Sequence, residues 1–91
     1  MNENTVYVGS KPVMTYVMAI ISAMKDQDEV VVKARGRAIS IAVDAAEVTR
    51  NRYLTGLKST VEIGTEAMET EDGGTRNVST IAITLSKSPE A

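Results

Sequence analysis

The sequence predicts a two-layer α+β domain with the order β-α-β-α-β-β, in which a long hairpin between the last two strands protrudes from the body. Three observations lead to this prediction. Two segments repeat apolar residues at helical spacing, four segments alternate apolar and polar residues, and the turn sequence Glu71-Asp72-Gly73-Gly74 separates the last two. The 91 residues are enough for one domain, 1–91, with a modest core that a partner subunit would help to stabilise.

The first half of the chain is expected to contain a strand, a helix and a second strand. Residues 5–10 alternate and are rich in β-forming residues. Pro12 suits the start of a helix, and apolar residues then recur at helical spacing to residue 25. Residues 29–35 form the second predicted strand. The apolar positions at helical spacing are Val13, Val17, Ile20, Ile21 and Met24. Met14, Met18 and Met24 are interpreted as core filler, and Val30, Val32 and Ala34 of the second strand are expected to face the core.

The second half is expected to contain a helix from residue 37 or 38 to about 53, followed by strands 58–68 and 76–86. The outer part of the hairpin, residues 66–77, is polar and should project by about 15–20 Å as an arm. Residues 88–91 are expected to be a disordered tail. The apolar residues expected inward are Ile39, Ala42, Val43, Ala46, Tyr53, Val61, Ile63, Ile81, Ile83 and Leu85.

Positive charge gathers in one region of an acidic chain. Six cations and two acids lie between residues 30 and 58, whereas the rest of the chain holds four cations and ten acids. Lys33, Arg35 and Arg37 occupy alternate positions around Gly36, which permits a sharp bend. Guanidinium groups fit phosphate oxygens in a bidentate manner, so this segment is a candidate site for a polyanion. The alternative interpretation is a row of solvated surface cations.

Lys11 and the arm are two further candidates for contact with a polyanion. Lys11 directly precedes the start of the first helix, where backbone N–H groups favour an anion. An ordinary surface lysine is the alternative interpretation, and by itself the position favours that alternative. The arm could enter a groove of DNA, but it carries Glu66, Glu69, Glu71 and Asp72 against the single cation Arg76. An exposed hairpin with no nucleic-acid contact is the alternative.

Several functional classes are disfavoured by absent residue types. The chain has no Cys and no His, which removes disulfides, thiolate ligands and the commonest general base, and favours a cytoplasmic protein. Asp44, Glu47 and Arg50 are spaced as an ion-pair ladder on a helix surface rather than as a catalytic pair. No enzyme activity, metal, cofactor or membrane span is therefore expected.

Two blocks of the sequence resemble the archaeal Alba family. Gly9-Ser10-Lys11-Pro12-Val13-Met14-Thr15-Tyr16 is similar to its G-x-K-P-V-M-x-Y opening. Residues 33–40, Lys-Ala-Arg-Gly-Arg-Ala-Ile-Ser, resemble its central motif. Later blocks that also fit are Ala42-Val43-Asp44, Arg50-Asn51-Arg52 and Val78-Ser79-Thr80-Ile81. The resemblance extends from about residue 5 to residue 87.

The resemblance implies a small, dimeric, chromosome-associated chromatin protein that condenses double-stranded DNA and also binds RNA. It implies that Lys11, Arg35 and Arg37 are the main phosphate contacts. It also implies that an acetyltransferase modifies Lys11, which weakens DNA binding, and that a deacetylase reverses this modification. Tyr53 falls where the family commonly has a Phe used in contacts between dimers along DNA. The remaining residues of the implied nucleic-acid surface are Ser10, Tyr16, Lys33, Gly36 and Arg76.

The sequence also departs from the family in ways that remove positive potential. Ser10 stands where many relatives have a lysine, Ile41 stands where many have another, and the arm is acidic. We therefore expect a homodimer that binds DNA through phosphates, largely without sequence preference, but more weakly than basic relatives. The alternatives are a primarily RNA-binding or RNA-chaperone protein, and a protein–protein module whose acidic arm engages a basic partner.

Overall fold

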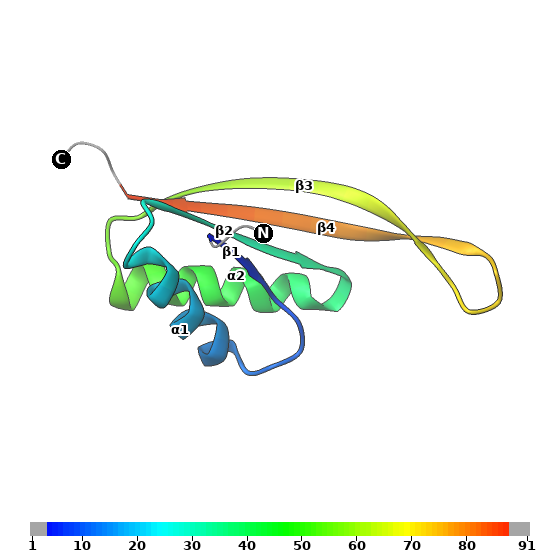
Figure 1. The fold of residues 1–91 in the computed structure, drawn as a ribbon, viewed down its shortest axis with the longest axis horizontal. Coiled ribbons are helices and arrows are strands. Elements are labelled where there is room, and N and C mark those ends of the chain that lie inside the picture. Colours follow the sequence, from blue (N-terminus) through cyan, green and yellow to red (C-terminus); the bar gives the residue numbers. More distant parts are fainter. Residues whose placement is uncertain (1–3, 88–91) are drawn as a thin grey trace.

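The computed structural model describes residues 4–87 and contains a four-stranded sheet with both helices on one face (Figure 1). The elements follow the predicted order. They are β1 (Thr5–Tyr7), α1 (Val13–Met24), β2 (Glu29–Arg35), α2 (Ile39–Val48), β3 (Lys58–Glu69) and β4 (Thr75–Ser86). A 3₁₀ turn, Gly36–Ala38, leads into α2, and a π-helical turn, Thr49–Tyr53, continues it. The predicted fold class is therefore confirmed. The predicted tail, residues 88–91, lies outside the described residues.

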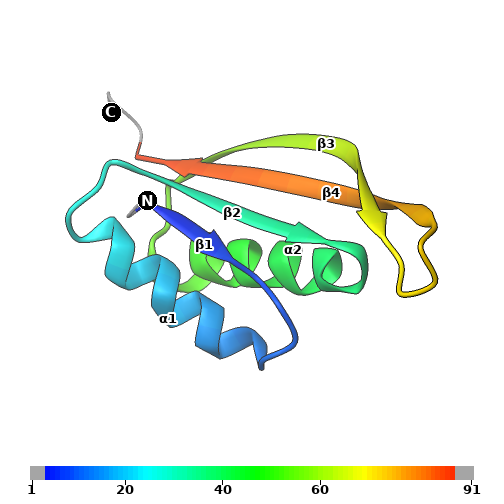
Figure 2. The same ribbon diagram turned by 45° about the vertical axis from the view of Figure 1, so that its right-hand side comes forward.

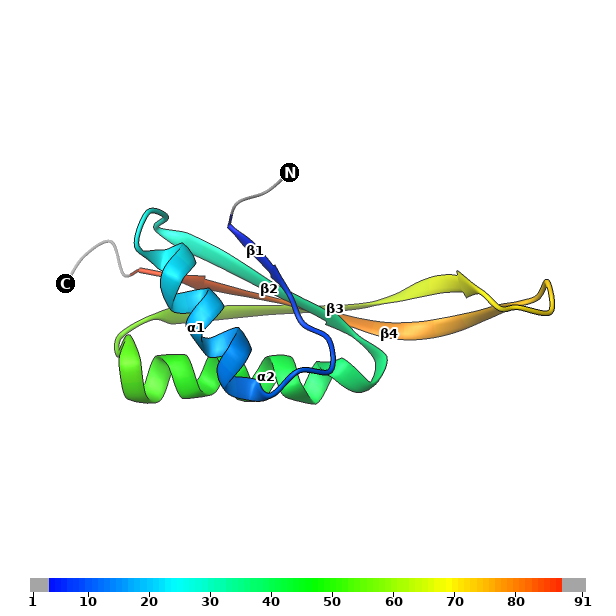
Figure 3. The ribbon, with the colours of Figure 1, turned by 60° about the horizontal axis from the view of Figure 1, so that its bottom comes forward.

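The sheet has the strand order β1-β2-β4-β3. β1 and β2 run parallel side by side and are joined through α1, while β4 is antiparallel to both of its neighbours (Figure 2). The pairing between β2 and β4 ends at Arg35 and Thr80, and beyond this point β4 pairs only with β3. The hairpin consequently leaves the body as a two-stranded arm that reaches past the helices (Figure 3). The longest dimension is 51 Å, about twice the other two, 24 and 23 Å.

The core lies between the helices and β1, β2 and β4. Val17 and Ile20 of α1 are fully buried, as is Leu85 of β4. Three small buried residues of α2, at positions 42, 45 and 46, let this helix lie close to β2 and β4. The alternation predicted for β2 and β4 is confirmed, because Val30, Val32, Ala34, Ile81, Ile83 and Leu85 are all buried.

Val61 and Ile63, which were expected in the core, are exposed to 55% and 78%. They pair with Ile83 and Ile81 of β4 and so lie on the sheet face that the helices cover. However, β3 is the edge strand, and α2 packs on β2 and β4 rather than on β3. The predicted direction of these side chains was right, but no element within residues 4–87 covers them.

Four other residues expected in the core also lie at the surface. Met14 and Met18 are exposed on α1, whereas Met24 is buried as predicted. Val43 and Tyr53 are exposed, whereas Ala42 and Ala46 on the same stripe are buried and Ile39 is partly buried. Helical spacing places such residues near a boundary of the buried face, but it does not show how far the sheet extends beneath them.

Candidate nucleic-acid interface

The loop that follows β1 is held in place by Tyr16. This side chain is buried, with 7% of its surface exposed. Its hydroxyl accepts hydrogen bonds from the backbone N–H groups of Gly9 at 2.9 Å and Lys11 at 3.0 Å. Two bonds to one rigid ring fix the backbone of the loop, while the side chains of Ser10 and Lys11 stay exposed. Tyr16 therefore positions the loop and offers no free surface for a ligand.

Gly36 produces the bend at the end of β2. Its φ is +59°, in the left-handed region that residues with a Cβ rarely adopt. The chain turns there from the extended Arg35 into the 3₁₀ turn that contains Arg37. Because this position requires glycine, the two arginines lie on either side of a fixed bend, and the predicted role of Gly36 in changing direction agrees with the geometry.

The loop after β1 and the bend after β2 together form a hollow of about 350 Å³. We call it the arginine hollow, and the residues that line it are Gly9, Ser10, Arg35, Arg37, Ala38 and Ile41. Arg35 and Arg37 are its charged lining residues, and none of its lining residues is acidic. This combination of charge and shape suits a phosphate group. Lys11 is next to Ser10 in the chain, although it is not one of the lining residues.

Lys33 lies in a different place, on the face of the sheet opposite the helices. A broader trough of about 780 Å³, the sheet trough, occupies this open face. Its lining includes Tyr7, Lys33, Arg35, Glu62, Gly64 and Ala82. Arg35 is the one cation that lines both the arginine hollow and the sheet trough. The three cations predicted as a single row thus border two hollows, because the bend at Gly36 separates Arg37 from the sheet.

Arg35 is also engaged by an acid from the arm. Its Nη1 lies 3.0 Å from Oε1 of Glu66, and about half of each side chain remains exposed. An exposed pair of this kind contributes only about 0–1 kcal/mol to stability. Sequence reasoning identified both residues but could not pair them, since 31 positions separate them. The pairing depends on the register that sets β3 and β2 on either side of β4.

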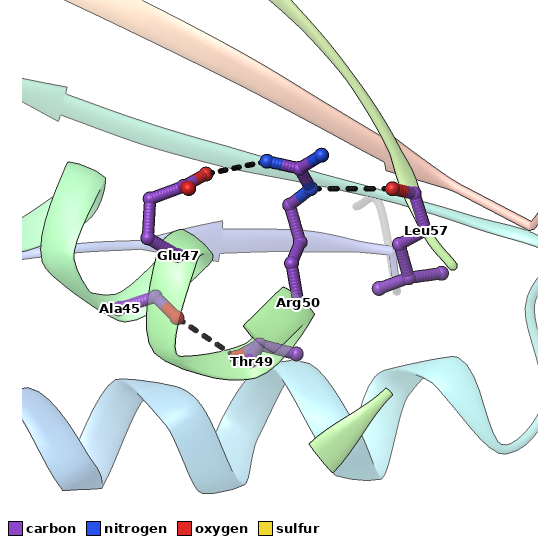
Figure 4. A network of polar contacts seen from close by, with 5 residues as sticks. All are labelled: Ala45, Glu47, Thr49, Arg50 and Leu57. Carbon is purple, nitrogen blue, oxygen red and sulfur yellow. Dashed lines mark hydrogen bonds and ion pairs between the residues drawn. The ribbon is translucent and has the colours of Figure 1, made fainter. Parts of the chain in front are cut away.

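Arg50 has a structural role at the end of α2 (Figure 4). Its Nη1 lies 2.8 Å from Oε2 of Glu47, and its Nε donates to the backbone oxygen of Leu57 at 3.2 Å. The Glu47–Arg50 half of the predicted ladder is present, while Asp44 forms no ion pair with any described residue. Beside it, the buried Thr49 hydroxyl donates to the backbone oxygen of Ala45 at 2.8 Å. Arg50 thus ties α2 to the segment before β3.

Tyr53 and Arg76, two of the predicted site residues, line neither the arginine hollow nor the sheet trough, and the same holds for Lys11, Tyr16 and Gly36. Tyr53 ends the π-helical turn and is half exposed. Arg76 is exposed on the arm, where it pairs in register with Met68. Ser10, Arg35 and Arg37 line the arginine hollow, and Gly36 forms the bend between the two arginines. Neither Tyr53 nor Arg76 lines this hollow. Any ligand that contacts all of these residues must therefore be extended.

The tip of the arm is closed by a small network around Asp72. Its carboxylate accepts hydrogen bonds from the Thr70 hydroxyl and from the backbone N–H of Gly74. The Thr70 hydroxyl, followed by the Gly74 N–H, lowers the pKa of Asp72 below its ordinary value of 3.8. Gly73, with φ of +89°, completes the turn. One of the four arm acids is therefore used to hold the turn.

Residues 4–87 contain neither a metal-binding cluster nor a membrane-spanning helix. Within this range, no group of three or more acidic side chains is arranged to hold a metal ion. Neither described helix has the length and apolar character needed to cross a membrane.

Comparison with known proteins gives consistent matches. The sequence model of the Alba family matches residues 4–66. The "DNA/RNA-binding protein Alba 1" of Archaeoglobus fulgidus is 49% identical over 89 residues, which cover 96% of this chain and 99% of the relative. The "DNA/RNA-binding protein Alba" of Methanocella arvoryzae is 48% identical over 91 residues, covering 98% of this chain and 94% of the relative.

A solved structure supports the same relationship. The structure of Alba from Thermoplasma volcanium superposes with a TM-score of 0.87 at 41% sequence identity. The match covers 92% of this chain and all of that one, so the two share the whole fold, including the hairpin.

Proposed function

This chain belongs to the Alba family, and on this basis we propose that it is a non-enzymatic protein that binds double-stranded DNA and RNA through their phosphates. The relatives at 48–49% identity are named as DNA/RNA-binding proteins and not as enzymes. The observation that carries the proposal is the arginine hollow, which Arg35 and Arg37 line and which has no acidic lining residue. The fixed loop holds Lys11 next to it.

Binding of this kind is chiefly electrostatic and does not read the base sequence. Each phosphate neutralised by a cation releases condensed counterions, so the affinity falls as salt increases. If a dimer neutralises about six phosphates, the slope of log affinity against log salt concentration on duplex DNA is about −5. Neither Ser10 nor Ile41 adds charge to the hollow, so the affinity is expected to be lower than that of basic relatives.

We propose a homodimer, and its support is the uncovered apolar edge of the sheet. Val61 and Ile63 are exposed on the helix-side face of β3, and Val43 is exposed on α2. A chain of this size buries only about 60–65% of its unfolded surface by itself, so covering such side chains with a second copy would add stability. A dimer would also double the number of cations available to one nucleic acid.

Three further parts of the proposal concern regulation and assembly. Acetylation of the exposed Lys11 would remove a charge beside the arginine hollow and weaken binding. The half-exposed Tyr53 would form contacts between dimers that lie side by side on DNA, with a hydroxyl that weakens an apolar contact. The protein would condense DNA as a chromatin component, associated with the chromosome in the cytoplasm.

Salt-dependent competition between matched duplex DNA and structured RNA tests the proposal. Fluorescence anisotropy should give steep salt dependence for both nucleic acids, and their relative affinity shows which is the main ligand. A flat salt response for both would contradict phosphate binding.

The acidic arm supports one different candidate function. Glu69 and Glu71 are exposed near its tip and form no ion pair with any described residue. A basic protein partner would find these carboxylates accessible. Recovery of partners after nuclease treatment, lost when the arm acids are changed to Ser, would favour this function.

A further inference from the structure

The sheet trough lies on a different surface from the arginine hollow and has a distinct floor. Ala82, Thr80 and Gly64 are neighbours across β4 and β3 and line the trough with short side chains. A Cβ added at Gly64 would lie 3.2 Å from the hydroxyl oxygen of Thr80, which is a crowded contact. Glycine at this position therefore keeps the middle of the trough open.

Longer side chains with complementary chemistry stand on either side of this floor. The strand register places Tyr7, Lys33, Ala82 and Glu62 in one row across the sheet. Tyr7 is 72% exposed, so its ring is available at one end of the row, while the Glu62 carboxylate stands at the other. Nearer the arm, the ion pair between Arg35 and Glu66 spans β4. The trough is thus bounded by an aromatic ring, a lysine, a carboxylate and an ion pair.

These groups match the parts of one unpaired nucleotide. An exposed aromatic ring binds a base by stacking, and a neighbouring cation binds its phosphate. The Glu62 carboxylate accepts hydrogen bonds from amino or imino groups on a base edge, and the Thr80 hydroxyl both donates and accepts them. A base in a duplex is already stacked and paired, so it cannot enter the trough in this way.

We propose that the sheet trough binds an unpaired nucleotide of a single-stranded nucleic acid, with its base stacked on Tyr7 and its phosphate at Lys33. This inference rests on the proposed function, because Arg35 lines both depressions. A strand whose phosphates lie in the arginine hollow can pass Arg35 and place a flanking base in the trough. Single-stranded segments therefore gain a contact that duplexes lack.

The test compares Tyr7→Ala with Tyr7→Phe by fluorescence anisotropy. The probes are a labelled 12-nucleotide single-stranded RNA, a single-stranded DNA of the same sequence, and the matched DNA duplex. Loss of one stacked base weakens single-strand binding by roughly 5- to 150-fold. We expect Tyr7→Ala to lose affinity in this range for one or both single strands. The affinity of Tyr7→Phe for the single strands should stay near that of wild type. Both variants should bind the duplex with unchanged affinity. The strand that loses affinity identifies which single-stranded nucleic acid uses the trough.

Arg37→Ala is the control that separates this inference from the proposed function. Arg37 lines only the arginine hollow, so its loss should weaken the duplex and the single strands alike. If Tyr7→Ala leaves single-strand binding unchanged, or weakens duplex binding equally, the trough is not a nucleotide site while the arginine hollow still stands. If wild-type protein binds no nucleic acid at all, the proposed function fails together with the inference. Thermal unfolding followed by circular dichroism confirms that each variant is folded.

Discussion

At the scale of single residues, Arg35 is the side chain on which most of the proposed interface depends. It borders the arginine hollow, lines the sheet trough and forms an ion pair with Glu66. A phosphate that binds Arg35 must compete with the Glu66 carboxylate for the same guanidinium group. In the proposed function, Glu66, the arm acid closest to the body, would therefore limit binding more directly than the acids near the tip.

Glu66→Gln removes this competition and should raise the affinity for duplex DNA. The ion pair is exposed, so the gain should be modest, about twofold to fivefold, which corresponds to an energy below about 1 kcal/mol. The matched control is Glu62→Gln, which makes the same charge change on the same strand and face but breaks no ion pair with a described residue. Equal gains for both variants would show that only net charge matters.

Ile41→Lys should also raise the affinity, because Ile41 lines the arginine hollow beside the two arginines. One more phosphate contact should make the log–log salt slope steeper by about 0.9 for each subunit that uses it. Thr55→Lys adds the same charge at an exposed position that does not line the hollow. Salt titrations of both variants on one duplex compare the two positions, and a slope change for Thr55→Lys as large as that for Ile41→Lys would contradict the prediction.

At the scale of secondary-structure elements, local pattern was enough to predict the order of strands and helices, the bend at Gly36 and the hairpin turn. The edge position of β3 was not predictable, because it depends on β4 pairing between β2 and β3. For the same reason the exposure of Val61, the pairing of Arg35 with Glu66 and the row that contains Tyr7 became visible only in the structure. Such features depend on strand register, to which residues far apart in the sequence contribute.

The hairpin turn should loosen in acid because of Asp72. The pKa of this carboxyl is lowered in the folded turn, so its stabilising effect is fully present above the unfolded value near 3.8 and is lost as the pH falls through the lower folded pKa. Below about pH 4, the Gly74 amide should therefore exchange its hydrogen faster than the ordinary pH dependence of base-catalysed exchange predicts. Asp72→Asn should abolish this pH dependence. Identical pH profiles for the two proteins would contradict the role of the carboxylate.

At the scale of the whole molecule, the fold separates three surfaces. The loop after β1, the bend after β2 and the start of α2 carry the arginine hollow. The face of the sheet opposite the helices carries the sheet trough, and the edge of β3 carries exposed apolar side chains. The arm is the continuation of β3 and β4 beyond the body (Figure 3). A second copy that covers the β3 edge would leave both candidate nucleic-acid surfaces open only if it stays clear of the trough.

Ile63→Asp should prevent this association. Ile63 is exposed in the single chain, so the variant loses little core packing, but a carboxylate at a dimer contact would be buried without a partner. Sedimentation equilibrium should show a dimer for wild type and a monomer for the variant. Thr60→Asp places the same charge at an exposed position on the other face of β3 and should leave the dimer intact. A dimeric Ile63→Asp protein would exclude this edge as the contact.

The salt dependence of duplex DNA binding by Arg35→Ala/Arg37→Ala tests the central claim most directly. The matched control is Lys25→Ala/Lys58→Ala, which removes the same charge from exposed positions outside the arginine hollow. If the two arginines of each subunit provide four of about six phosphate contacts, the log–log slope should change from about −5 to about −2 and the affinity should fall sharply. The control should keep a slope close to that of wild type. An unchanged slope and affinity in the arginine variant, or an equal loss in the control, would show that the arginine hollow is not the phosphate-binding surface.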